Sequence, residues 1–293
     1  MIIDRLLVIG VGLIGGSLSL ALRKAGAVRE IVGAGRNENN LKRAIELGVI
    51  DRYSLNFADE VPSSDVVVIA TPMLAMDSIF ETIVSTNYRD SIITDVGSAK
   101  TLLEELSDRY LDSSFTGFVP AHPIAGRECS GVEAASENLF ENMRTIITPT
   151  ARSSSHAIEK VRDMWAATGC VIDEMDVQSH DEILAATSHL PHVAAFALVN
   201  YIANHQDNRE CFQMAAGGFY DFTRIASSDP VMWRDICSAN ASLILQELNG
   251  YIDNLQQISA CISSGNIDEI EQIFRNAKSS RDENLKLDSH QQP

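Results

Sequence analysis

The feature that most constrains the fold lies near the amino end, where an apolar run meets a glycine motif. Residues 6–9 are typical of a buried strand, and Gly10-Val11-Gly12-Leu13-Ile14-Gly15 follows directly, ahead of a helix to about Ala25. In such a motif the first glycine permits a tight turn, the second lets the backbone approach a pyrophosphate, and the third lets helix and strand pack closely. The motif therefore predicts dinucleotide binding, although a glycine-rich turn that binds nothing has the same spacing.

The rest of the first half repeats this alternation of strand and helix. Apolar runs at 30–33 and 91–95 are each followed by a helical stretch, and a third run at 65–70 ends at Thr71-Pro72. Asn37 is the expected N-cap of a helix over 38–47, which Gly48 closes. Later strands are expected at 118–120, 145–148 and 170–172. Apolar strands that alternate with helices predict a mainly parallel sheet covered on both faces.

The pattern changes after residue 173. Residues 175–203 and 230–263 are long and helical, Gly217-Gly218 separates them, and the polar stretch after Asn276 is expected to fray. We therefore predict an α/β dinucleotide-binding domain over 1–173 and an all-helical domain over 174–293. Both helical stretches are apolar on more than one face, as at Phe196 and Leu248, which predicts a homodimer through this domain.

Charge and cysteine content limit the partners. Of 293 residues, 23 are Lys or Arg and 40 are Asp or Glu, so the net charge of -17 argues against nucleic acid and anionic membranes. The apolar run at 6–22 contains four glycines, which makes it a poor signal sequence or membrane span. The five cysteines lack CxxC spacing, so we expect neither a disulfide framework nor a zinc site, and a cytoplasmic location.

The end of the second predicted strand bears on the choice between NAD and NADP. NAD-binding folds usually place an acid there, which accepts from the ribose 2′-hydroxyl. This chain has Gly35 and then Arg36. Arg36 is either a ligand for a 2′-phosphate or a solvated loop cation, so we expect NADP to be accepted. Thr71-Pro72, after the third predicted strand, is placed near the cofactor unless it is a plain turn.

Two polar residues follow predicted strand ends, where open parallel sheets bind their ligands. Ser98 comes after the strand at 91–95, and His122 comes after the strand at 118–120. A lone loop histidine is more often structural, but Pro123 and Gly126 restrain this segment, and the topology directs the imidazole toward a bound nicotinamide. Histidine is suited to remove a hydroxyl proton while hydride leaves the same carbon. His122 is therefore the candidate base.

The helical part carries two further polar clusters. Ser188-His189-Leu190-Pro191-His192 places two histidines three residues apart, beside an expected proline kink. A metal pair would lack a third ligand, so we expect no metal, a substrate-facing His192 and a structural His189. Arg224 is either a bidentate clamp for a substrate carboxylate or the partner of a neighbouring aspartate.

Together these motifs resemble the prephenate dehydrogenase family, with its arogenate and cyclohexadienyl relatives. The resemblance runs in order over about residues 5–275 and is carried by segments 10–17, 95–100, 122–126, 188–192 and 221–233. It implies an α/β Rossmann-type dinucleotide-binding domain followed by an all-α dimerisation domain, with the active site between them. It also implies the oxidative decarboxylation of prephenate to 4-hydroxyphenylpyruvate, with hydride transfer to NAD or NADP, in tyrosine biosynthesis.

The resemblance also implies residue roles. His122 would bond the substrate 4-hydroxyl and accept its proton, and Ser98 would orient this hydroxyl and the nicotinamide. Arg224 would hold the ring carboxylate, assisted by His192. The remaining candidates are Ser188, Glu128 and Trp233 for the substrate, and Gly10, Gly12, Leu13, Ile14, Gly15, Arg36, Thr71 and Pro72 for the cofactor.

Three alternatives stay open. The substrate could be arogenate, a choice on which Arg127 bears as an added cation near His122. β-Hydroxyacid dehydrogenases and imine reductases share the domain plan, but they use a lysine, and this chain has none between Lys160 and Lys278. A regulator that senses NAD(P) without turnover would need neither His122 nor Arg224.

Overall fold

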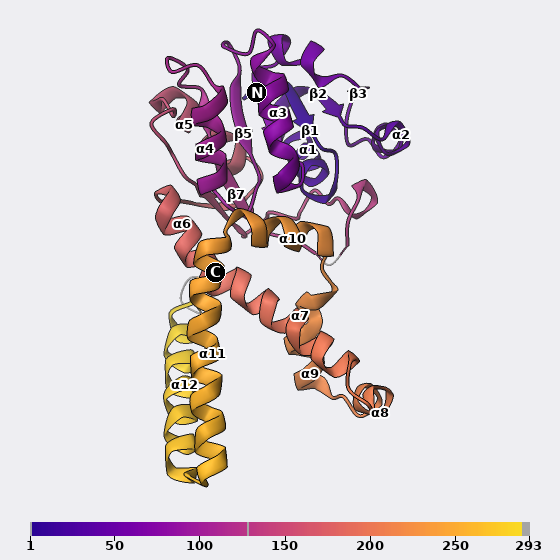
Figure 1. Ribbon diagram of the computed structural model, residues 1–293. Coiled ribbons are helices and arrows are strands. Elements are labelled where there is room, and N and C mark those ends of the chain that lie inside the picture. The colour runs from indigo at the N-terminus through magenta and orange to yellow at the C-terminus, as the bar shows by residue number, and fades with distance from the viewer. Residues whose placement is uncertain (1, 128, 289–293) are drawn as a thin grey trace. The chain divides into compact units, whose positions relative to one another are not determined.

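The computed structural model describes residues 2–127 and 129–288 (Figure 1). The chain divides into two compact units, residues 1–244 and residues 245–293. The first unit contains the sheets and helices α1–α10, and the second contains most of α11 together with α12.

Six parallel strands form the main sheet, in the order β3-β2-β1-β4-β5-β6, which confirms the predicted parallel sheet. The order reverses between β1 and β4. In open sheets the crevice at such a reversal, beyond the carboxyl ends of the strands, is where ligands bind. The strands are β1 (Ile3–Ile9), β2 (Val28–Ala34), β3 (Arg52–Ser54), β4 (Val66–Ile69), β5 (Ile92–Asp95) and β6 (Phe118–Val119).

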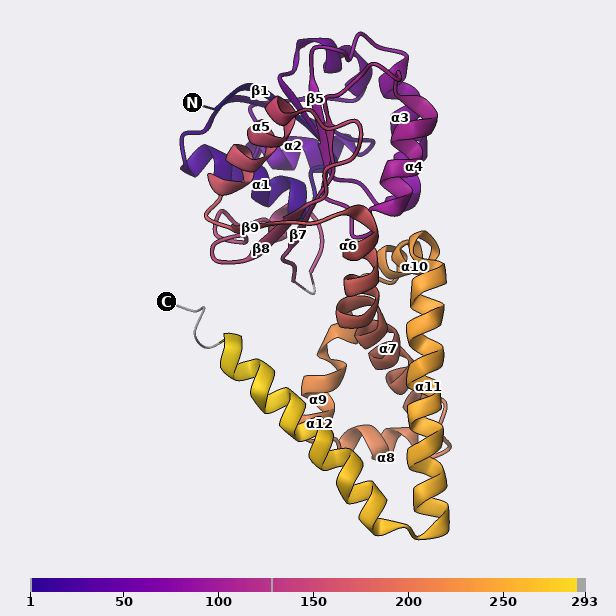
Figure 2. The ribbon, with the colours of Figure 1, turned by 90° about the vertical axis from the view of Figure 1, so that its left-hand side faces the viewer.

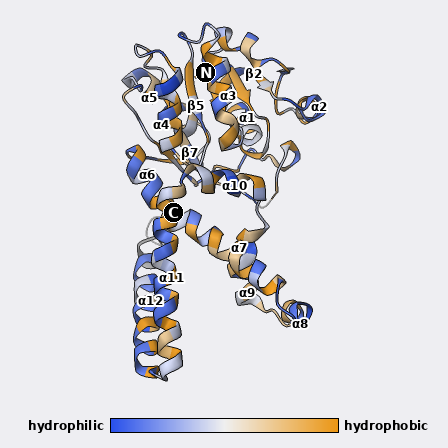
Figure 3. Cartoon of the chain, in the orientation of Figure 1, coloured by the Kyte–Doolittle hydropathy of each residue, from blue (hydrophilic) through white to orange (hydrophobic). Residues whose placement is uncertain are grey.

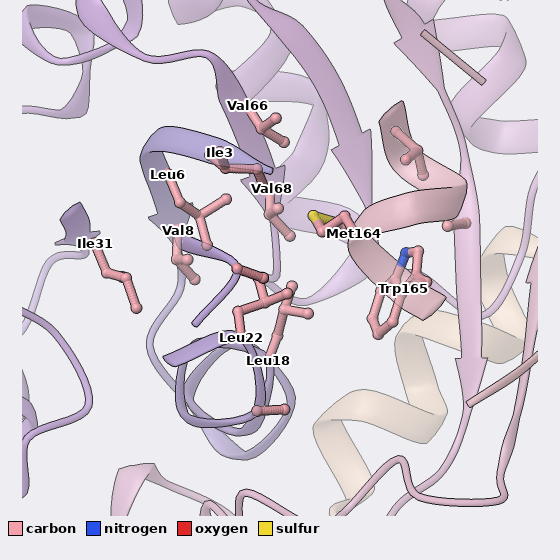
Figure 4. Packing of buried hydrophobic residues seen from close by; sticks show 14 of the residues in the cluster. Ile3, Leu6, Val8, Leu18, Leu22, Ile31, Val66, Val68, Met164 and Trp165 are labelled. Atoms are coloured by element: carbon pink, nitrogen blue, oxygen red, sulfur yellow. The ribbon is translucent and has the colours of Figure 1, made fainter. Parts of the chain in front are cut away.

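Helices cover both faces of this sheet (Figure 2). Alternate residues of β1 point to opposite faces, so Leu6 and Val8 join the core under α1, α2 and α5, whereas Leu7 and Ile9 join the core under α3 and α4. Figure 4 shows the first of these cores, with Trp165 of α5 fully buried in it. The helices are α1 (Leu13–Lys24), α2 (Glu38–Glu46), α3 (Met76–Val84), α4 (Thr101–Tyr110) and α5 (Ser155–Ala166).

Local sequence signals set several helix ends. The Asn37 side chain accepts a hydrogen bond from the Asn40 backbone N–H at 3.2 Å, so α2 begins at its predicted cap. Gly48 follows with a φ of +68°, the left-handed conformation that ends the helix. Short 3-10 turns lie at Phe57–Asp59, Val61–Ser63, Met73–Ala75, Val132–Ala134 and Arg224–Ser227.

The last strands of the α/β part form a second sheet. β7 (Ala121–Ile124) pairs antiparallel with β8 (Arg144–Ile147), which pairs parallel with β9 (Val171–Glu174). His122 therefore lies inside a strand, whereas the sequence placed it just beyond one. The reason is that the chain leaves the main sheet at Pro120 and pairs again at once with β8.

The first helical stretch after the sheets is continuous over Val177–Ala203. α6 (Val177–Leu184) passes through a π-helical turn, Ala185–His189, into α7 (Leu190–Ala203). At the expected proline kink the structure has this wider turn, and Pro191, which has no N–H for the helical ladder, follows two residues after it. By length and composition this is the one helix of the described part that could cross a membrane.

The second helical stretch is divided where the sequence predicted a single helix. α10 (Pro230–Ala239) ends at Asn240, whose side chain donates to the Asp181 carbonyl at 3.0 Å, and α11 (Ala241–Ser264) follows. The expected fraying after Asn276 is also wrong up to residue 288. Side-chain pairs four residues apart, Glu271–Arg275 and Lys278–Asp282, support the polar part of α12. The remaining helices are α8 (Asn208–Gln213), α9 (Gly217–Thr223) and α12 (Ile267–Asp288).

Candidate active site

A cavity of about 900 Å³ lies in the first unit, at the carboxyl ends of the strands around the reversal point. The turns after β1, β4 and β5, together with β7 and the loop after it, supply one side. Residues of the π-helical turn, α7 and α10 supply the other. Of the candidates, Gly12, Leu13, Ile14, Thr71, Pro72, Ser98, His122, Ser188, His192 and Trp233 line it.

The turn between β1 and α1 is shaped for a pyrophosphate. Gly10 has a φ of +102°, and a Cβ there would lie 2.4 Å from the Ala70 carbonyl oxygen. A Cβ on Gly15 would lie 2.3 Å from the Gly10 carbonyl oxygen, whereas one on Gly12 would meet nothing within 4 Å. Gly10 and Gly15 therefore allow close packing beneath the turn, and Gly12 leaves the backbone open above it. The N-terminus of α1, which has no acidic side chain in its first turn, faces this opening as an anion site.

The residues expected to meet the ribose lie outside the cavity lining. Arg36 is exposed, and no hydrogen bond or ion pair joins it to another residue in the described ranges. A Cβ on Gly35 would touch only Leu41, at 3.8 Å, so the backbone leaves room for a larger side chain. An exposed cation beside the end of β2 fits the negative charge of a cofactor 2′-phosphate.

A buried ion pair holds the loop that carries Ser98. The Lys100 ammonium donates to Asp95 at 2.6 Å and to the Ala121 carbonyl at 2.7 Å, and both charged side chains are fully buried. Asp95 also accepts from the Gly97 N–H at 2.6 Å. Burial lowers the pKa of Lys100, and the adjacent Asp95 carboxylate opposes that shift. These bonds tie the Ser98 loop to the start of β7, next to His122.

Behind His122 runs a chain of buried hydrogen bonds. His122 Nδ1 lies 2.9 Å from His180 Nε2, and His180 Nδ1 lies 2.7 Å from a carboxylate oxygen of Asp181. Asp181 in turn accepts from the backbone N–H groups of Lys100 and Thr101, each at 2.8 Å, at the start of α4. His180 and Asp181 are fully buried, and His122 is only 8% exposed.

This chain of bonds determines where the protons lie. Burial raises the pKa of Asp181, but bonds from His180 and the α4 backbone outweigh it and lower the pKa, so the carboxylate is charged. His180 therefore donates from Nδ1 to Asp181 and accepts at Nε2, so His122 must donate from Nδ1. The unprotonated Nε2 of His122 is then the nitrogen that is available to accept a proton from a molecule in the cavity.

The electrostatics keep His122 in this neutral form. Burial lowers its pKa well below the ordinary 6.5, and positive charge on His180 or Lys100 would lower it further. Burial also lowers the pKa of His180, against the influence of Asp181. A neutral imidazole with one free nitrogen, lining a cavity, is able to accept a proton from a bound hydroxyl.

On the helical side, aromatic packing builds the wall of the cavity. The His192 ring stacks on Trp233 with the centroids 3.7 Å apart, and its Nδ1 lies 2.9 Å from the Ser188 carbonyl oxygen. His189 is buried, and this burial is the main reason why its pKa is lowered to about 4. The structure thus places His192 and Ser188 at the cavity, with His189 buried beside them.

Not every candidate comes together here. Arg224 is exposed at the start of a 3-10 turn and is not among the lining residues, although the next residue, Ile225, is. Glu128 lies outside the described residues. Within the described ranges, no group of three or more His, Cys, Asp or Glu side chains is arranged to hold a metal ion.

Sequence reasoning missed His180 and Asp181. A signal for them exists, because Val177, His180, Asp181 and Leu184 follow the i, i+3, i+4, i+7 spacing of one helix face, and all four are buried. Polar residues on an otherwise apolar face need partners, which marks them as candidates for a buried network.

Comparisons with known proteins agree with this geometry. The family model "Prephenate dehydrogenase, nucleotide-binding domain" matches residues 18–174, and "Prephenate dehydrogenase, dimerization domain" matches residues 176–276. Over 282 residues the chain is 36% identical to a prephenate dehydrogenase of Bacillus subtilis, covering 95% of this chain and 76% of that one. Over 283 residues it is 31% identical to a cyclohexadienyl dehydrogenase of Zymomonas mobilis, covering 96% of each.

A solved structure is similar along nearly the whole chain. It is prephenate dehydrogenase from A. aeolicus in complex with hydroxyphenyl propionate and NAD+, with a TM-score of 0.88 and 33% sequence identity. The match covers 96% of this chain and 98% of that one. The predicted α/β fold followed by a helical dimerisation domain is thereby confirmed.

The buried chain behind His122 yields a testable prediction. Asp181→Asn keeps an oxygen for the α4 backbone but removes the charge that orients His180, so we expect kcat to fall by about 10²–10⁴-fold. In the unsubstituted enzyme, the acid limb of kcat/KM should lie below pH 6.5, because the pKa of His122 is lowered. In the variant the limb should move to still lower pH, since protonated His122 loses a stabilising charge.

The matched control is Asp176→Asn, which alters an exposed cap of the same helix. It should leave kcat and the acid limb unchanged. An Asp181→Asn enzyme that folds and keeps both its kcat and its acid limb would show that Asp181 acts only as a helix cap.

Proposed function

The chain belongs to the prephenate dehydrogenase family, and on this premise we propose that His122 is the base of an oxidative decarboxylation of prephenate to 4-hydroxyphenylpyruvate. The observation that carries the proposal is the chain of hydrogen bonds that leaves a neutral His122 with a free nitrogen at the cavity, beside the glycine turn for a dinucleotide. The enzyme is an NAD(P)-dependent dehydrogenase.

The cofactor fits the turn after β1. Gly10, Gly12 and Gly15 with the first turn of α1, at Leu13 and Ile14, would hold the pyrophosphate. Thr71 and Pro72, after β4, line the cavity between this turn and Ser98, where a bound cofactor would continue. When bound, the nicotinamide supplies the acceptor for the hydride that leaves C4 of the substrate ring.

The proton balance gives His122 two tasks. As C4 becomes a carbonyl, its hydroxyl proton passes to His122 Nε2. The bond from C1 to the ring carboxylate then breaks, CO₂ leaves, and its electron pair enters the ring to form a phenolate. The phenolate recovers the proton from His122, so the reaction takes up no net proton. Asp181, through His180, stabilises His122 while it is charged.

The other candidates position the substrate. Ser98, half-buried at the end of β5, is proposed to orient the hydroxyl and the nicotinamide. The stacked His192 and Trp233 are proposed to support the substrate ring, with Ser188 beside them. The roles of Arg224 on the ring carboxylate and of Glu128 at the site follow from the family resemblance and remain part of the proposal.

We also propose a homodimer. In the unit 245–293, α11 and α12 diverge from the turn at Gly265, and hydrophobic residues are interspersed along both (Figures 2 and 3). Large apolar side chains such as Leu255, Ile262 and Phe274 are exposed on them, and only 22% of the most apolar window of Val177–Ala203 is buried. Such faces favour association with a second copy.

The domain limits of 1–173 and 174–293 and the cytoplasmic location belong to the same proposal. The family models support the limits, since one ends at residue 174 and the next begins at residue 176. Five free cysteines among the described residues accord with a reducing compartment. Activity with arogenate is the second candidate, because a relative 31% identical to the chain carries the broader name cyclohexadienyl dehydrogenase.

Turnover itself is the direct test. With prephenate and NAD or NADP, the enzyme should form NAD(P)H and release CO₂, which a sensing regulator would not do. His122→Asn should lower kcat by about 10²–10⁴-fold with little change in substrate KM, because a general base acts in the transition state. No turnover with prephenate or arogenate would reject the proposed function, and a normal kcat for His122→Asn would reject this base.

Cofactor choice should depend on the end of β2. Arg36→Ala should weaken the use of NADP at least about tenfold more than that of NAD, since it removes a charge-assisted bond to the 2′-phosphate. Gly35→Asp should shift kcat/KM toward NAD, and the modest contact with Leu41 leaves room for it. Arg29→Ala, at the other end of the strand, should affect neither cofactor. A kcat/KM at least about a hundredfold higher with NAD than with NADP, unchanged for both cofactors in Arg36→Ala, would contradict this prediction.

The proposed dimer should form through the exposed apolar faces of the helical part. Light scattering at micromolar concentration should return twice the 32.0 kDa chain mass. Ile262→Glu should shift the population toward the monomer, because a buried charge opposes an apolar contact. Leu55→Glu, at a position that is also exposed but lies on the sheet domain, should not. A single-chain mass for the unsubstituted protein would contradict the dimer.

A further inference from the structure

The cavity holds very little charge. Among the described residues that line it, Arg127 is the one Lys or Arg, and Asp229 is the one carboxylate. Asp229 is already engaged, since it accepts from the Val231 and Met232 N–H groups at the start of α10, at 2.8 and 3.0 Å. His122 and His189, whose pKa values burial lowers, are neutral. Arg127 therefore supplies the fixed positive charge of the lining.

Arg127 is also available to a ligand. It lies three residues after the end of β7, in the loop that begins beyond Ile124 and lines the cavity. Its side chain is exposed, and no hydrogen bond or ion pair joins it to any residue in the described ranges. A guanidinium presents two parallel N–H groups that match a carboxylate.

The two carboxylates of the substrate have different fates. The ring carboxylate loses its charge when it leaves as CO₂, whereas the side-chain carboxylate stays charged throughout. A cation against the leaving group, the role proposed for Arg224, anchors the substrate but loses its partner as CO₂ departs, so a second cation there would oppose that departure. A cation against the side-chain carboxylate binds substrate and transition state equally. Arg127 can therefore serve the side chain without opposing catalysis.

From this geometry, and resting on the proposed function, we propose that Arg127 binds the side-chain carboxylate and selects the 2-oxo side chain of prephenate over the 2-amino side chain of arogenate. The side chain of prephenate carries a net charge of minus one, which Arg127 attracts. The ammonium group of arogenate cancels that charge and brings a second cation toward Arg127. Among the described residues of the lining, Asp229 is the one carboxylate that could attract the ammonium group, and it already accepts hydrogen bonds from the start of α10.

Binding of hydroxyphenyl propionate separates the two carboxylates, because this ligand has a side-chain carboxylate and no ring carboxylate. Calorimetry with the NAD-loaded enzyme should show its Kd raised about 10–100-fold by Arg127→Gln and largely restored by Arg127→Lys. Arg109→Gln, an exposed arginine of α4 paired with Asp77, is the control and should change nothing. An unchanged Kd in Arg127→Gln would overturn the proposal.

Kinetics test the selectivity. In Arg127→Gln the KM for prephenate should rise about 10–100-fold with kcat nearly constant, while kcat/KM for arogenate stays level or increases. Equal losses for both substrates, or a rise confined to the KM of the cofactor, would overturn the proposal. These results differ from failure of the proposed function, in which the unsubstituted enzyme would turn over neither substrate.

Discussion

The backbone N–H groups of Lys100 and Thr101 donate to the Asp181 carboxylate, which joins the start of α4 to α6. From the same point the Lys100 side chain reaches Asp95 and the Ala121 carbonyl, so the end of β5 and the start of β7 meet there too. Lys100, Asp95 and Asp181 are fully buried, and buried charges are tolerated only when they are paired and hydrogen-bonded. Loss of one partner from such a group costs about 3–5 kcal/mol. The positions of Ser98 and His122 both depend on this junction.

The same junction sets the chemistry. The N-terminus of α4 and two backbone N–H groups stabilise the Asp181 anion. That anion fixes the proton of His180, and His180 in turn fixes the proton of His122. The free nitrogen of the base is thus determined by bonds that begin at a helix end. Burial keeps the imidazole neutral before reaction, and the distant anion stabilises it once it has accepted a proton.

How far the site could be predicted depended on how local each signal was. Gly10, Gly12 and Gly15 are recognised from their spacing, because the turn they form is complete within six residues. The positions of Ser98 and His122 are predicted from strand ends in the same way, although His122 lies within β7 of the second sheet. The pair His180 and Asp181 acquires its role only when α6 packs on α4, a contact between residues 80 positions apart. Sequence spacing alone does not contain such contacts, and this also explains why the exposed position of Arg224 was not anticipated.

The two sides of the cavity recognise charge by different means. The cofactor side offers backbone groups, at Gly12 and the first turn of α1, which bind phosphate without any charged side chain. On the substrate side a chain with a net charge of -17 must still bind a dianion. Further cations beside Arg224 would hold the ring carboxylate and oppose its departure, whereas the stacked rings of His192 and Trp233 offer an aromatic surface to the substrate ring. A cavity that is mostly neutral, with its fixed cation at Arg127 in the loop after β7, therefore reconciles substrate capture with the loss of CO₂.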